Sequence, residues 1–524
     1  MPIRITGMNS GLDTESIISE LVSAQSFKKQ KYVKSQTKLS WKQAAWKTLN
    51  SKMYSFHQSA LSNMRFSDAY AKKKTTLSNP NIASVVSASN TVDGVQTLKV
   101  EKLAKSGYLT GGQVSNADGS STKSDTTMAD LMGLAPGKTA SMELSVGGNT
   151  TQIDLTAEST VSDVVKQLKA AGVNASFDET NKRFFVSSTS TGLEKEFELK
   201  GTNDDGIKAL SKMGLLVDGQ ADASYASKVS SLGLKFSNDP AIGETGATRT
   251  AAQDAKIYLN GAAFTSGSNT FAINGMTITA LAASDEEVQM TTQTDYDGIY
   301  DTVKKFLKEY NTLINEISTL YNADEAKKYE PLTSEEKDEM SDHEIEEWEK
   351  KIKDSLLRHD SSLGNVKDAM VEIMQSGVDV GGKKYYLSDF GINTKSYFES
   401  SEKDRYELHI DGDKEDSYSS ANEDKLKSMI AADPTTVSSF FQALSNELYS
   451  KMQKLMAGND LSSSMTFYND KEMETEYKDY TSKIEDQEEK IKALEDKWYS
   501  KFSAMETALA KLSSKTSAIS SMLG

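Results

Sequence analysis

The N-terminal part of the chain carries hydrophobic residues at the spacing of one long helix. Residues 13–71 contain no proline, and no glycine follows Gly11 until Gly94. One column repeats every seven positions and mixes apolar with polar side chains: Ile18, Gln25, Tyr32, Leu39, Trp46, Met53 and Ala60. A second column contains Leu21, Leu49 and Phe56, with polar residues between the first and the others. This spacing predicts a long helix with a coiled-coil-like seam that is weak in its middle.

The first turn of this helix has a defined start within GMNSGLDTESIISELVSAQ, residues 7–25. Asp13 is the predicted N-cap, because its carboxylate is placed to accept the backbone N–H of Glu15 or Ser16. Leu12 and Ile17 then occupy the two positions of a hydrophobic staple. Gly7 and Gly11 give the preceding residues conformational freedom.

The C-terminal part repeats the helical pattern more regularly. One unbroken column lies seven positions apart: Tyr477, Ile484, Ile491, Trp498, Met505, Leu512 and Ile519. A second column starts with Tyr480 and Leu494 and drifts to Phe502, Leu509 and Leu523, as expected when a helix of 3.6 residues per turn outruns a strict 3.5-residue repeat. The pattern predicts a long packed helix, and the alternative is an ordinary amphipathic helix on a globular core.

The two terminal helices carry opposite charges. The first is basic through Lys28, Lys29, Lys31, Lys34, Lys38, Lys42, Lys47 and Lys52. The second is acidic through Glu472, Glu474, Glu476, Asp479, Glu485, Asp486, Glu488 and Glu489. Opposite flanking charges help to select partner and orientation in a coiled coil, so we expect the two helices to pair. The alternative is that each charged face is solvated independently.

Between the terminal helices, residues 75–294 show short runs of alternating apolar and polar side chains. Turn pairs separate these runs: Asp93-Gly94, Gly147-Gly148, Asn260-Gly261 and Asn274-Gly275. Two helices interrupt them, one over 159–172 with Ser159 or Thr160 as its cap, and one over 204–215. The pattern predicts two small β domains, one inserted in the other.

Helical periodicity returns at residues 295–322. One face of this helix is apolar: Tyr296, Ile299, Val303, Phe306, Tyr310, Leu313, Ile317 and Leu320. Residues 324–354 are strongly acidic and are predicted to form a solvated helical arm. A short β element and a helix beginning near residue 433 follow.

We therefore predict an α+β multidomain fold, with a long helical coiled-coil-like rod from both termini and inserted β-rich domains. Four parts are expected: a terminal helical domain (1–40 and 485–524), a helical rod domain with an acidic insertion near 323–360 (41–74 and 295–484), an inner β-rich domain (75–107 and 225–294) and an outer inserted β-rich domain (108–224).

Composition excludes several kinds of chemistry. The formal net charge of −16 argues against general nucleic-acid binding. The chain has no cysteine, so thiol catalysis, disulfides and cysteine-bound metals are excluded. Its four histidines are isolated in sequence and have no metal-ligand spacing. Trp41, Trp46, Trp348 and Trp498 lie in predicted helices and are interpreted as packing or interface anchors.

Two short segments resemble ligand-binding loops but lack the required residues. GLAPGKT, residues 133–139, has three residues between its glycines where a phosphate-binding loop has four, and a strand follows it. DGDKED, residues 411–416, lacks the glycine and the distal glutamate of a calcium loop. Both are interpreted as turns, and we predict no catalytic, cofactor-binding or metal-binding residue and no enzymatic activity.

No apolar run in the chain is long enough to span a bilayer, and residues 1–11 contain no apolar signal segment. These features predict a cytosolic protein or one that is exported without a cleaved apolar signal.

Six segments, taken in order, resemble the motifs of one bacterial family. They are residues 10–25 (SGLDTESIISELVSAQ), 98–112, 130–138 with 159–192, 254–281, 303–322 (VKKFLKEYNTLINEISTLYN) and 497–523. This order is similar to that of the flagellar filament capping proteins, the FliD or hook-associated protein 2 family. Residues 265–268 depart from the Arg-Ser-Ser-Asn turn that is frequent there, and residues 323–360 match no part of the family pattern.

The resemblance implies a non-enzymatic homo-oligomer without cofactors, outside the cell at the tip of the flagellar filament. Its rods would form a stalk or legs and its β domains a plate, and it would promote the insertion of flagellin. It would leave the cell unfolded, through the flagellar type III export apparatus and without a cleaved signal. The implied partners are flagellin, the hook–filament junction protein and a cytoplasmic export chaperone.

On this reading the terminal helices carry the helix-docking and oligomer-interface residues: Leu12, Asp13, Ile17, Ile18, Leu21, Tyr32, Leu39, Ile491, Trp498, Phe502, Met505, Leu509, Leu512, Ile519 and Leu523. Isolated helices are marginal in water, so we expect them to order only against neighbouring subunits or flagellin. Polar seam residues such as Gln25, Ser35, Gln487 and Lys515 would permit release and renewed docking.

Two other functions fit helical termini around a β-rich middle. One is a filament subunit or a hook–filament junction protein. The other is a surface adhesin whose β domains bind host glycans.

Overall fold

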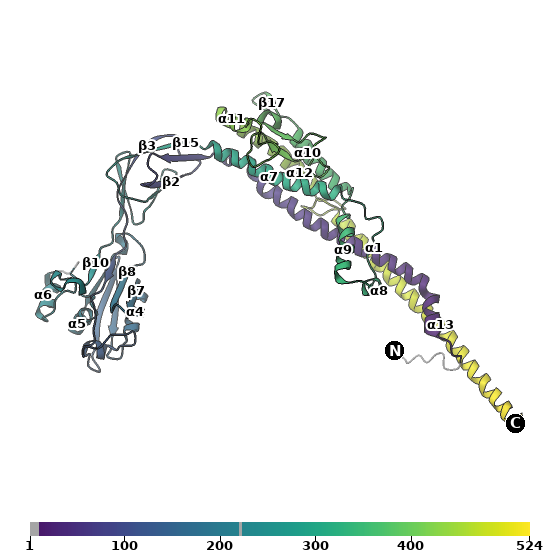
Figure 1. Ribbon diagram of the computed structural model, residues 1–524, viewed down its shortest axis with the longest axis horizontal. Coiled ribbons are helices and arrows are strands. Elements are labelled where there is room, and N and C mark those ends of the chain that lie inside the picture. Colours follow the sequence, from purple (N-terminus) through teal and green to yellow (C-terminus); the bar gives the residue numbers. More distant parts are fainter. Residues whose placement is uncertain (1–9, 219–222, 524) are drawn as a thin grey trace. The chain divides into compact units, whose positions relative to one another are not determined.

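The computed structural model describes residues 10–218 and 223–523. The described residues divide into two compact units (Figure 1). Unit 1 contains those up to Tyr70 and those from Tyr296 onward, and unit 2 contains Ala71–Asp295. The predicted α+β multidomain fold is confirmed, because helices from both ends of the chain form unit 1 and the strands between them form unit 2.

Unit 1 is built mainly from helices. They are α1 (Thr14–Phe56), a π-helical turn (His57–Leu61), α2 (Ser62–Met64), α7 (Tyr296–Tyr321), α8 (Ser334–Asp338), α9 (Asp342–Asp354), α10 (Ser361–Gln375), α11 (Lys425–Ala432), α12 (Pro434–Leu455) and α13 (Asp470–Leu523). Two hairpins complete it: β16 (Val378–Val380) with β17 (Lys383–Tyr385), and β18 (Ile392–Thr394) with β19 (Leu408–Ile410).

One hydrophobic core joins α1, α7, α10 and α12 in unit 1. The predicted apolar face of α7 is confirmed at six positions, which are buried: Ile299, Val303, Phe306, Tyr310, Leu313 and Ile317. Phe440 and Phe441 of α12 pack edge to face, and Phe390 lies against both rings. The second half of α1 enters the same core through Trp46, Leu49, Met53 and Phe56.

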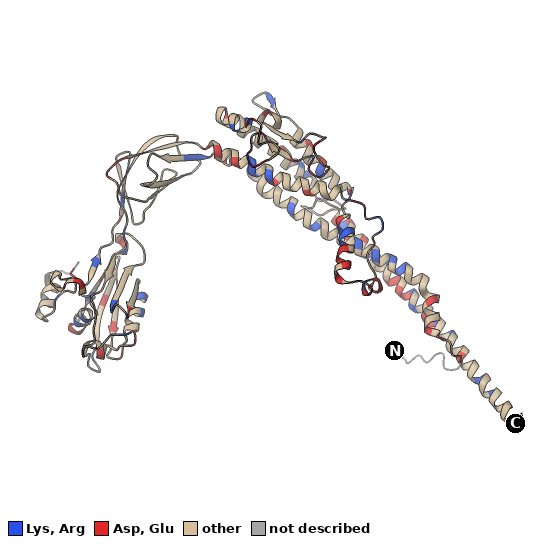
Figure 2. Cartoon of the chain, viewed as in Figure 1, with Lys and Arg blue, Asp and Glu red and all other residues tan. Residues whose placement is uncertain are grey.

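The acidic segment of unit 1 is helical as predicted, but it is not a free arm. Lys34 of α1 forms ion pairs with Glu336 at 3.1 Å and with Glu330 at 3.9 Å. The Lys353 ammonium lies 4.6 Å from the centroid of the Trp41 ring. The segment therefore docks on the basic helix α1, because its carboxylates meet lysines there (Figure 2).

A buried histidine sits where α1 passes into the π-helical turn. The His57 ring stacks on Tyr449 of α12 with 3.9 Å between centroids, and its Nε2 donates to the Tyr449 carbonyl at 3.3 Å. Its Nδ1 is buried without a hydrogen-bond partner among the described residues. Burial lowers the pKa of His57 from its ordinary value of 6.5, and the nearby Arg65 charge acts in the same direction.

Unit 1 is therefore expected to lose stability in acid through His57. As pH falls below 6.5, the unfolded chain binds the proton first, so the free energy of unfolding decreases until the pH passes the lower pKa of the folded state. His57→Phe keeps the stack on Tyr449 and removes the titrating group. Urea unfolding of both proteins across this pH range should show a weaker pH dependence in the variant, and identical dependences would contradict the assignment.

Unit 2 contains two groups of antiparallel sheets. The first group has the strand order β1-β15-β3-β11-β12 and β13-β14-β2. Its bounds are β1 (Lys73–Leu77), β2 (Ala83–Ser87), β3 (Gly94–Lys102), β11 (Ala255–Leu259), β12 (Ala262–Ser266), β13 (Thr270–Ile273), β14 (Met276–Ala280) and β15 (Val288–Thr294). Residues 73–74 pair with β15, whereas the sequence analysis placed them in the rod. The prediction missed them because β1 is mostly polar and shows no alternation of apolar and polar residues.

The second group has the orders β10-β4-β8-β7 and β6-β5-β9. Its strands are β4 (Tyr108–Thr110), β5 (Ala140–Val146), β6 (Asn149–Leu155), β7 (Val173–Asp178), β8 (Arg183–Ser188), β9 (Phe197–Gly201) and β10 (Thr248–Thr250). Its helices are α3 (Met128–Met132), α4 (Val161–Ala170), α5 (Asp204–Lys212) and α6 (Ala223–Ser231). Both predicted helices are thus present, and Thr160 caps α4.

Glycine turns set the hairpins of unit 2 as the sequence predicts. Gly147-Gly148 joins β5 to β6, Asn260-Gly261 joins β11 to β12, and Asn274-Gly275 joins β13 to β14. Both residues of each pair have positive φ, which matches the right-handed twist of the flanking strands.

Each sheet group has its own hydrophobic cluster, one around Leu98, Ile257 and Ile278 and the other around Met142, Phe184 and Leu210. The second cluster includes Val229, and Ala247 packs against it. The sequence analysis placed residues 225–250 in the other domain, although β10 pairs with β4 here. The pattern of these residues is too irregular to show which core they join.

Candidate docking interface of the terminal helices

The start of α1 is capped as predicted. The Asp13 carboxylate accepts the backbone N–H of Ser16 at 3.1 Å and the Ser16 hydroxyl at 2.7 Å. These hydrogen bonds lower the pKa of Asp13. Gly11 has a φ of +67°, which suits glycine just before the cap, whereas Gly7 lies outside the described residues.

The terminal helices α1 and α13 pack antiparallel in the same chain. Ser10 hydrogen-bonds to Glu506, the Lys29 ammonium lies 2.9 Å from the Glu488 carboxylate, and the Gln36 amide donates to the Thr481 hydroxyl at 2.7 Å. The Tyr32 and Tyr480 rings lie 6.5 Å apart between centroids. Rising numbers on α1 thus meet falling numbers on α13, and the predicted pairing is confirmed.

Among the lysines predicted to pair with α13, only one near the start of the basic run contributes an ion pair to it in the described residues. Lys29 pairs with Glu488 of α13, whereas Lys42 pairs with Asp360 at 2.7 Å and Lys52 with Glu316 at 2.7 Å. The basic face of α1 is therefore shared among several acidic partners of unit 1. Exposed pairs of this kind contribute about 0–1 kcal/mol each, so the seam depends on packing as well.

The seam is weak in its middle, as the sequence predicts. Ile18 and Val22 are buried near the start of α1, and Leu39 and Trp46 are buried further along. Every side chain of residues 23–38 is exposed or half-buried, and Tyr32 is half-buried among them. The apolar contacts at the two ends are therefore separated by a polar stretch of four turns.

Leu21 does not join the seam between α1 and α13, because its side chain is 43% exposed and Val22 is buried instead. Its predicted place in an interface with another molecule stays a prediction. Leu21 follows Ile18 by three positions and Val22 by four, so both spacings fit one helix face and the spacing alone does not select Val22. Thr14 is also buried and was not predicted. Leu12 is exposed and Ile17 is half-buried, so the hydrophobic staple that they would form stays a prediction.

The facing side of α13 has the predicted apolar residues in half-buried positions: Ile491, Trp498, Phe502, Met505 and Leu509. Two polar residues are buried among them. Glu506 meets Ser10, and Gln487 has a buried Oε1 without a hydrogen-bond partner among the described residues. A buried polar atom left unpaired weakens a seam, which agrees with the predicted role of Gln487.

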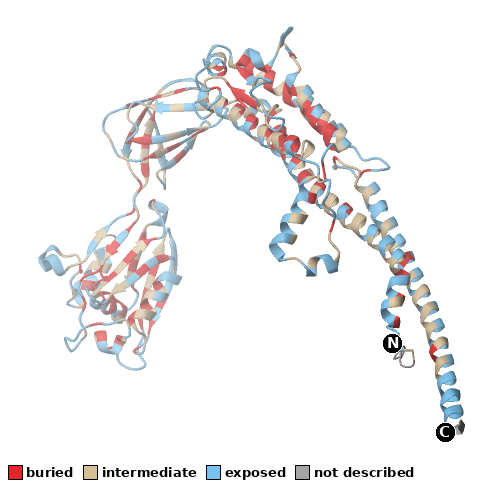
Figure 3. Cartoon of the chain, turned by 45° about the vertical axis from the view of Figure 1, so that its right-hand side comes forward, coloured by how far each residue is buried: buried red, intermediate tan, exposed pale blue. Residues whose placement is uncertain are grey.

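Beyond this seam, α13 overhangs the end of α1. Residues 511–521 are all exposed, and Leu512 and Ile519 are 63% and 57% exposed (Figure 3). The side chain of Leu523 lies outside the described part of the structure. We call residues 511–523 the overhang; at 1.5 Å per residue it is about 20 Å long. The predicted column thus continues past the point where an intrachain partner ends.

The pairing of α1 with α13 corrects one prediction. The sequence led us to expect terminal helices that order only against other molecules. Residues 14–56 instead have a partner within the chain, because α13 runs back along them. Among the described residues of α13, only the overhang is still expected to need another molecule as its partner, because its apolar side chains face solvent.

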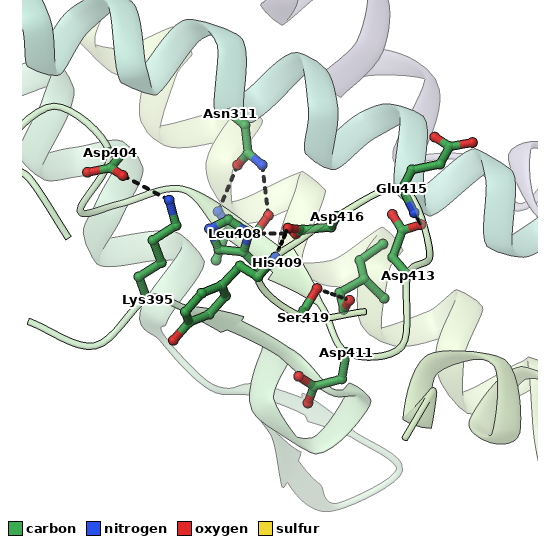
Figure 4. A network of polar contacts seen from close by, with 12 residues as sticks. Asn311, Lys395, Asp404, Leu408, His409, Asp411, Asp413, Glu415, Asp416 and Ser419 are labelled. Atoms are coloured by element: carbon green, nitrogen blue, oxygen red, sulfur yellow. Dashed lines mark hydrogen bonds and ion pairs between the residues drawn. The ribbon is translucent and has the colours of Figure 1, made fainter. Parts of the chain in front are cut away.

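The acidic loop 411–416 is a structural element of unit 1. Asp413 accepts from the Lys304 ammonium at 2.8 Å, and Asp416 lies 2.6 Å from Nδ1 of the buried His409 (Figure 4). Burial opposes ionisation of Asp416, but the His409 contact and the Tyr418 backbone N–H together lower its pKa. These contacts tie the loop to α7 and β19.

The sequence predicts neither of two other kinds of site, a metal site and a phosphate-binding loop. In the described ranges, no group of three or more His, Asp or Glu side chains is placed to hold a metal ion. Residues 133–139 connect the end of α3 to β5 and include a turn, as predicted. Within the same ranges no helix is both long and apolar enough to cross a membrane.

Comparisons with known proteins identify similar chains. The family models described as flagellar hook-associated protein 2 N-terminus and C-terminus match residues 10–107 and 252–514. The flagellar hook-associated protein 2 of Halalkalibacterium halodurans is 24% identical over 461 residues, which cover 85% of this chain and 80% of that protein. The A-type flagellar hook-associated protein 2 of Pseudomonas aeruginosa is 25% identical over 321 residues, which cover 60% of this chain and 63% of that protein.

Among solved structures, the D1-D2-D3 domains of the Escherichia coli flagellar cap protein FliD are similar in part. The sequence identity is 20% and the TM-score is 0.46, over 79% of this chain and 96% of that one.

Proposed function

Since the chain belongs to the flagellar hook-associated protein 2 family, we propose that it caps the distal end of a bacterial flagellar filament. The observation that carries this proposal is the extent of the family match. Residues 10–107 and 252–514 include α1, most of α13 and the strands that lead into and out of unit 2. The role is structural and needs no catalytic group.

The proposed cap is a homo-oligomer outside the cell, at the filament tip, that promotes insertion of flagellin. The antiparallel pair α1–α13 supports a leg-like element, and the overhang supplies an apolar surface for docking on the filament. The polar middle of the seam and the unpaired Gln487 keep this pairing weak enough to open and close as subunits are added.

The proposal includes the export route and the partners. The chain leaves the cell unfolded through the flagellar type III apparatus, held before export by a cytoplasmic chaperone. At the tip it meets flagellin and, before the filament grows, the hook–filament junction protein. The absence of cysteine fits this route, because folding after export then needs no disulfide chemistry.

Filament growth in a strain without its own copy of the protein tests the function. With the chain supplied, long filaments are expected; without it, flagellin that leaves the channel should escape into the medium. Negative-stain images of the purified protein separate the alternatives. A closed ring or plate with legs supports a cap, long fibres would support a filament subunit, and full filament growth without the chain would contradict capping and leave adhesion to be examined.

A further inference from the structure

A groove lies on the face of α1 that is turned away from α13. It has a volume of about 440 Å³ and is closed on its other side by the segment that precedes α8. We call it the basic groove after its three lysines, and its lining includes Phe27, Lys31, Lys34 and Lys38 from α1, with Tyr329, Glu330 and Pro331 opposite. Among the described residues of this lining, Glu330 carries the one carboxylate, which lies 3.9 Å from the Lys34 ammonium.

The basic groove contains an exposed aromatic side chain and ammonium groups that have no ion pair among the described residues. Phe27 is 69% exposed, which is unusual for a phenylalanine on a helix that has a packed partner. Lys34 is held by Glu336, whereas Lys31 and Lys38 are exposed and have no ion pair among the described residues. Two unpaired ammonium groups, with an aromatic side chain one turn before the first of them, fit an acidic partner that also offers a small or apolar residue.

A surface of that chemistry is present on α13. Asp479, Asp486 and Glu489 are exposed and have no ion pair among the described residues. They lie on one side of the helix, because they are separated by seven and three positions. Ser482, exposed and small, lies between the first two. We call these four residues the acidic face, and Figure 2 shows acidic residues along this part of α13.

We propose that the basic groove of one copy of this chain binds the acidic face of a second copy. Lys31 and Lys38 are seven residues apart on α1, as Asp479 and Asp486 are on α13, so both charge pairs are separated by about 10 Å along their helices. The two surfaces thus match in charge and in spacing.

This contact makes the association head to tail. The groove and the acidic face are different surfaces of one copy, so each copy offers both, and such contacts form a ring if the rotation between copies closes. The inference rests on the proposed function, which requires a homo-oligomer. It deepens that function by assigning one subunit contact to the paired terminal helices and to the acidic segment.

Charge reversal on the full-length protein tests the proposal. Lys31→Glu with Lys38→Glu should weaken self-association at least about tenfold at low salt, and Asp479→Lys with Asp486→Lys should do the same, because like charges then face each other. An equimolar mixture of the two variants should associate again, because every contact in an alternating ring is then complementary. Sedimentation velocity gives the association state.

A matched control makes the same change of charge elsewhere in unit 1. Lys414→Glu with Lys454→Glu replaces exposed lysines outside the groove and should associate like the wild type. Thermal unfolding should be unchanged in all three variants, because all the replaced side chains are exposed and none forms an ion pair with the residues that the structure describes.

The association of the wild type and the variants distinguishes a failure of the proposed contact from a failure of the capping function. If the wild type forms rings and the groove variants form them equally well, the proposed contact is wrong and the capping function stands. If the wild type stays monomeric both in solution and on filament ends, both are overturned. Loss of association in each variant, with recovery in the mixture, supports the contact.

Discussion

Replacing both Leu512 and Ile519 with aspartate is expected to abolish filament growth while leaving the fold of unit 1 intact. Both side chains are more than half exposed in the overhang, so the substitutions remove no packing within the chain. Their effect on the unfolding free energy should stay within about 0.5 kcal/mol. Docking of the overhang against an apolar surface would bury two carboxylates, which is strongly unfavourable without partners.

The overhang offers a matched control for this result. Ser514→Asp with Ser521→Asp places two carboxylates seven residues apart in the same exposed stretch but on the opposite side of the helix. Filament growth should continue with this variant. Growth that continues equally with Leu512→Asp and Ile519→Asp would show that the apolar column of the overhang has no role in docking.

Trp46→Ala is expected to destabilise unit 1 by about 3–5 kcal/mol. The Trp46 side chain is fully buried, and its ring stacks on Tyr468 with 5.1 Å between centroids and 9° between planes. Tyr468 lies two residues before the first residue of α13, so this contact joins the middle of α1 to the start of the returning helix. Removing the indole leaves a cavity where the two helices meet the core. Urea unfolding of the full chain, monitored by circular dichroism, measures the loss.

Trp46→Phe keeps an aromatic ring at this position and removes the indole N–H. The indole Nε1 is buried without a hydrogen-bond partner among the described residues, so a phenyl ring loses no polar contact there. Such a swap should destabilise unit 1 less than Trp46→Ala does, because the phenyl ring leaves a smaller cavity. Equal destabilisation by alanine and phenylalanine would contradict the stacking account.

The sequence predicted the helical elements well because their signals are local. The Asp13 cap, the face of α7 and the weak middle of the seam follow from residue type and spacing within a few turns. Glycine turns likewise marked the hairpins of unit 2. The antiparallel return of α13 along α1 was indicated by the opposite charges of the two helices.

The wrong predictions concern contacts between segments that lie far apart in the sequence. Leu21 and Val22 are equally apolar neighbours, and only the direction of α13 decides which of them is buried. The acidic segment docks on α1 through single contacts such as Lys34 with Glu336, some 300 residues apart, which no local pattern reveals. The apolar column of the overhang continues past the described part of α1, so its predicted docking role stays a prediction.

Hydrogen–deuterium exchange of the protein, free and bound to filament ends, tests the central claim most directly. The account predicts slow exchange in residues 17–25 in both states, because α13 covers them, and fast exchange in residues 511–523 that becomes slow on the filament. Fast exchange of 511–523 in both states, or slow exchange in both, would contradict the claim that the overhang is the docking surface.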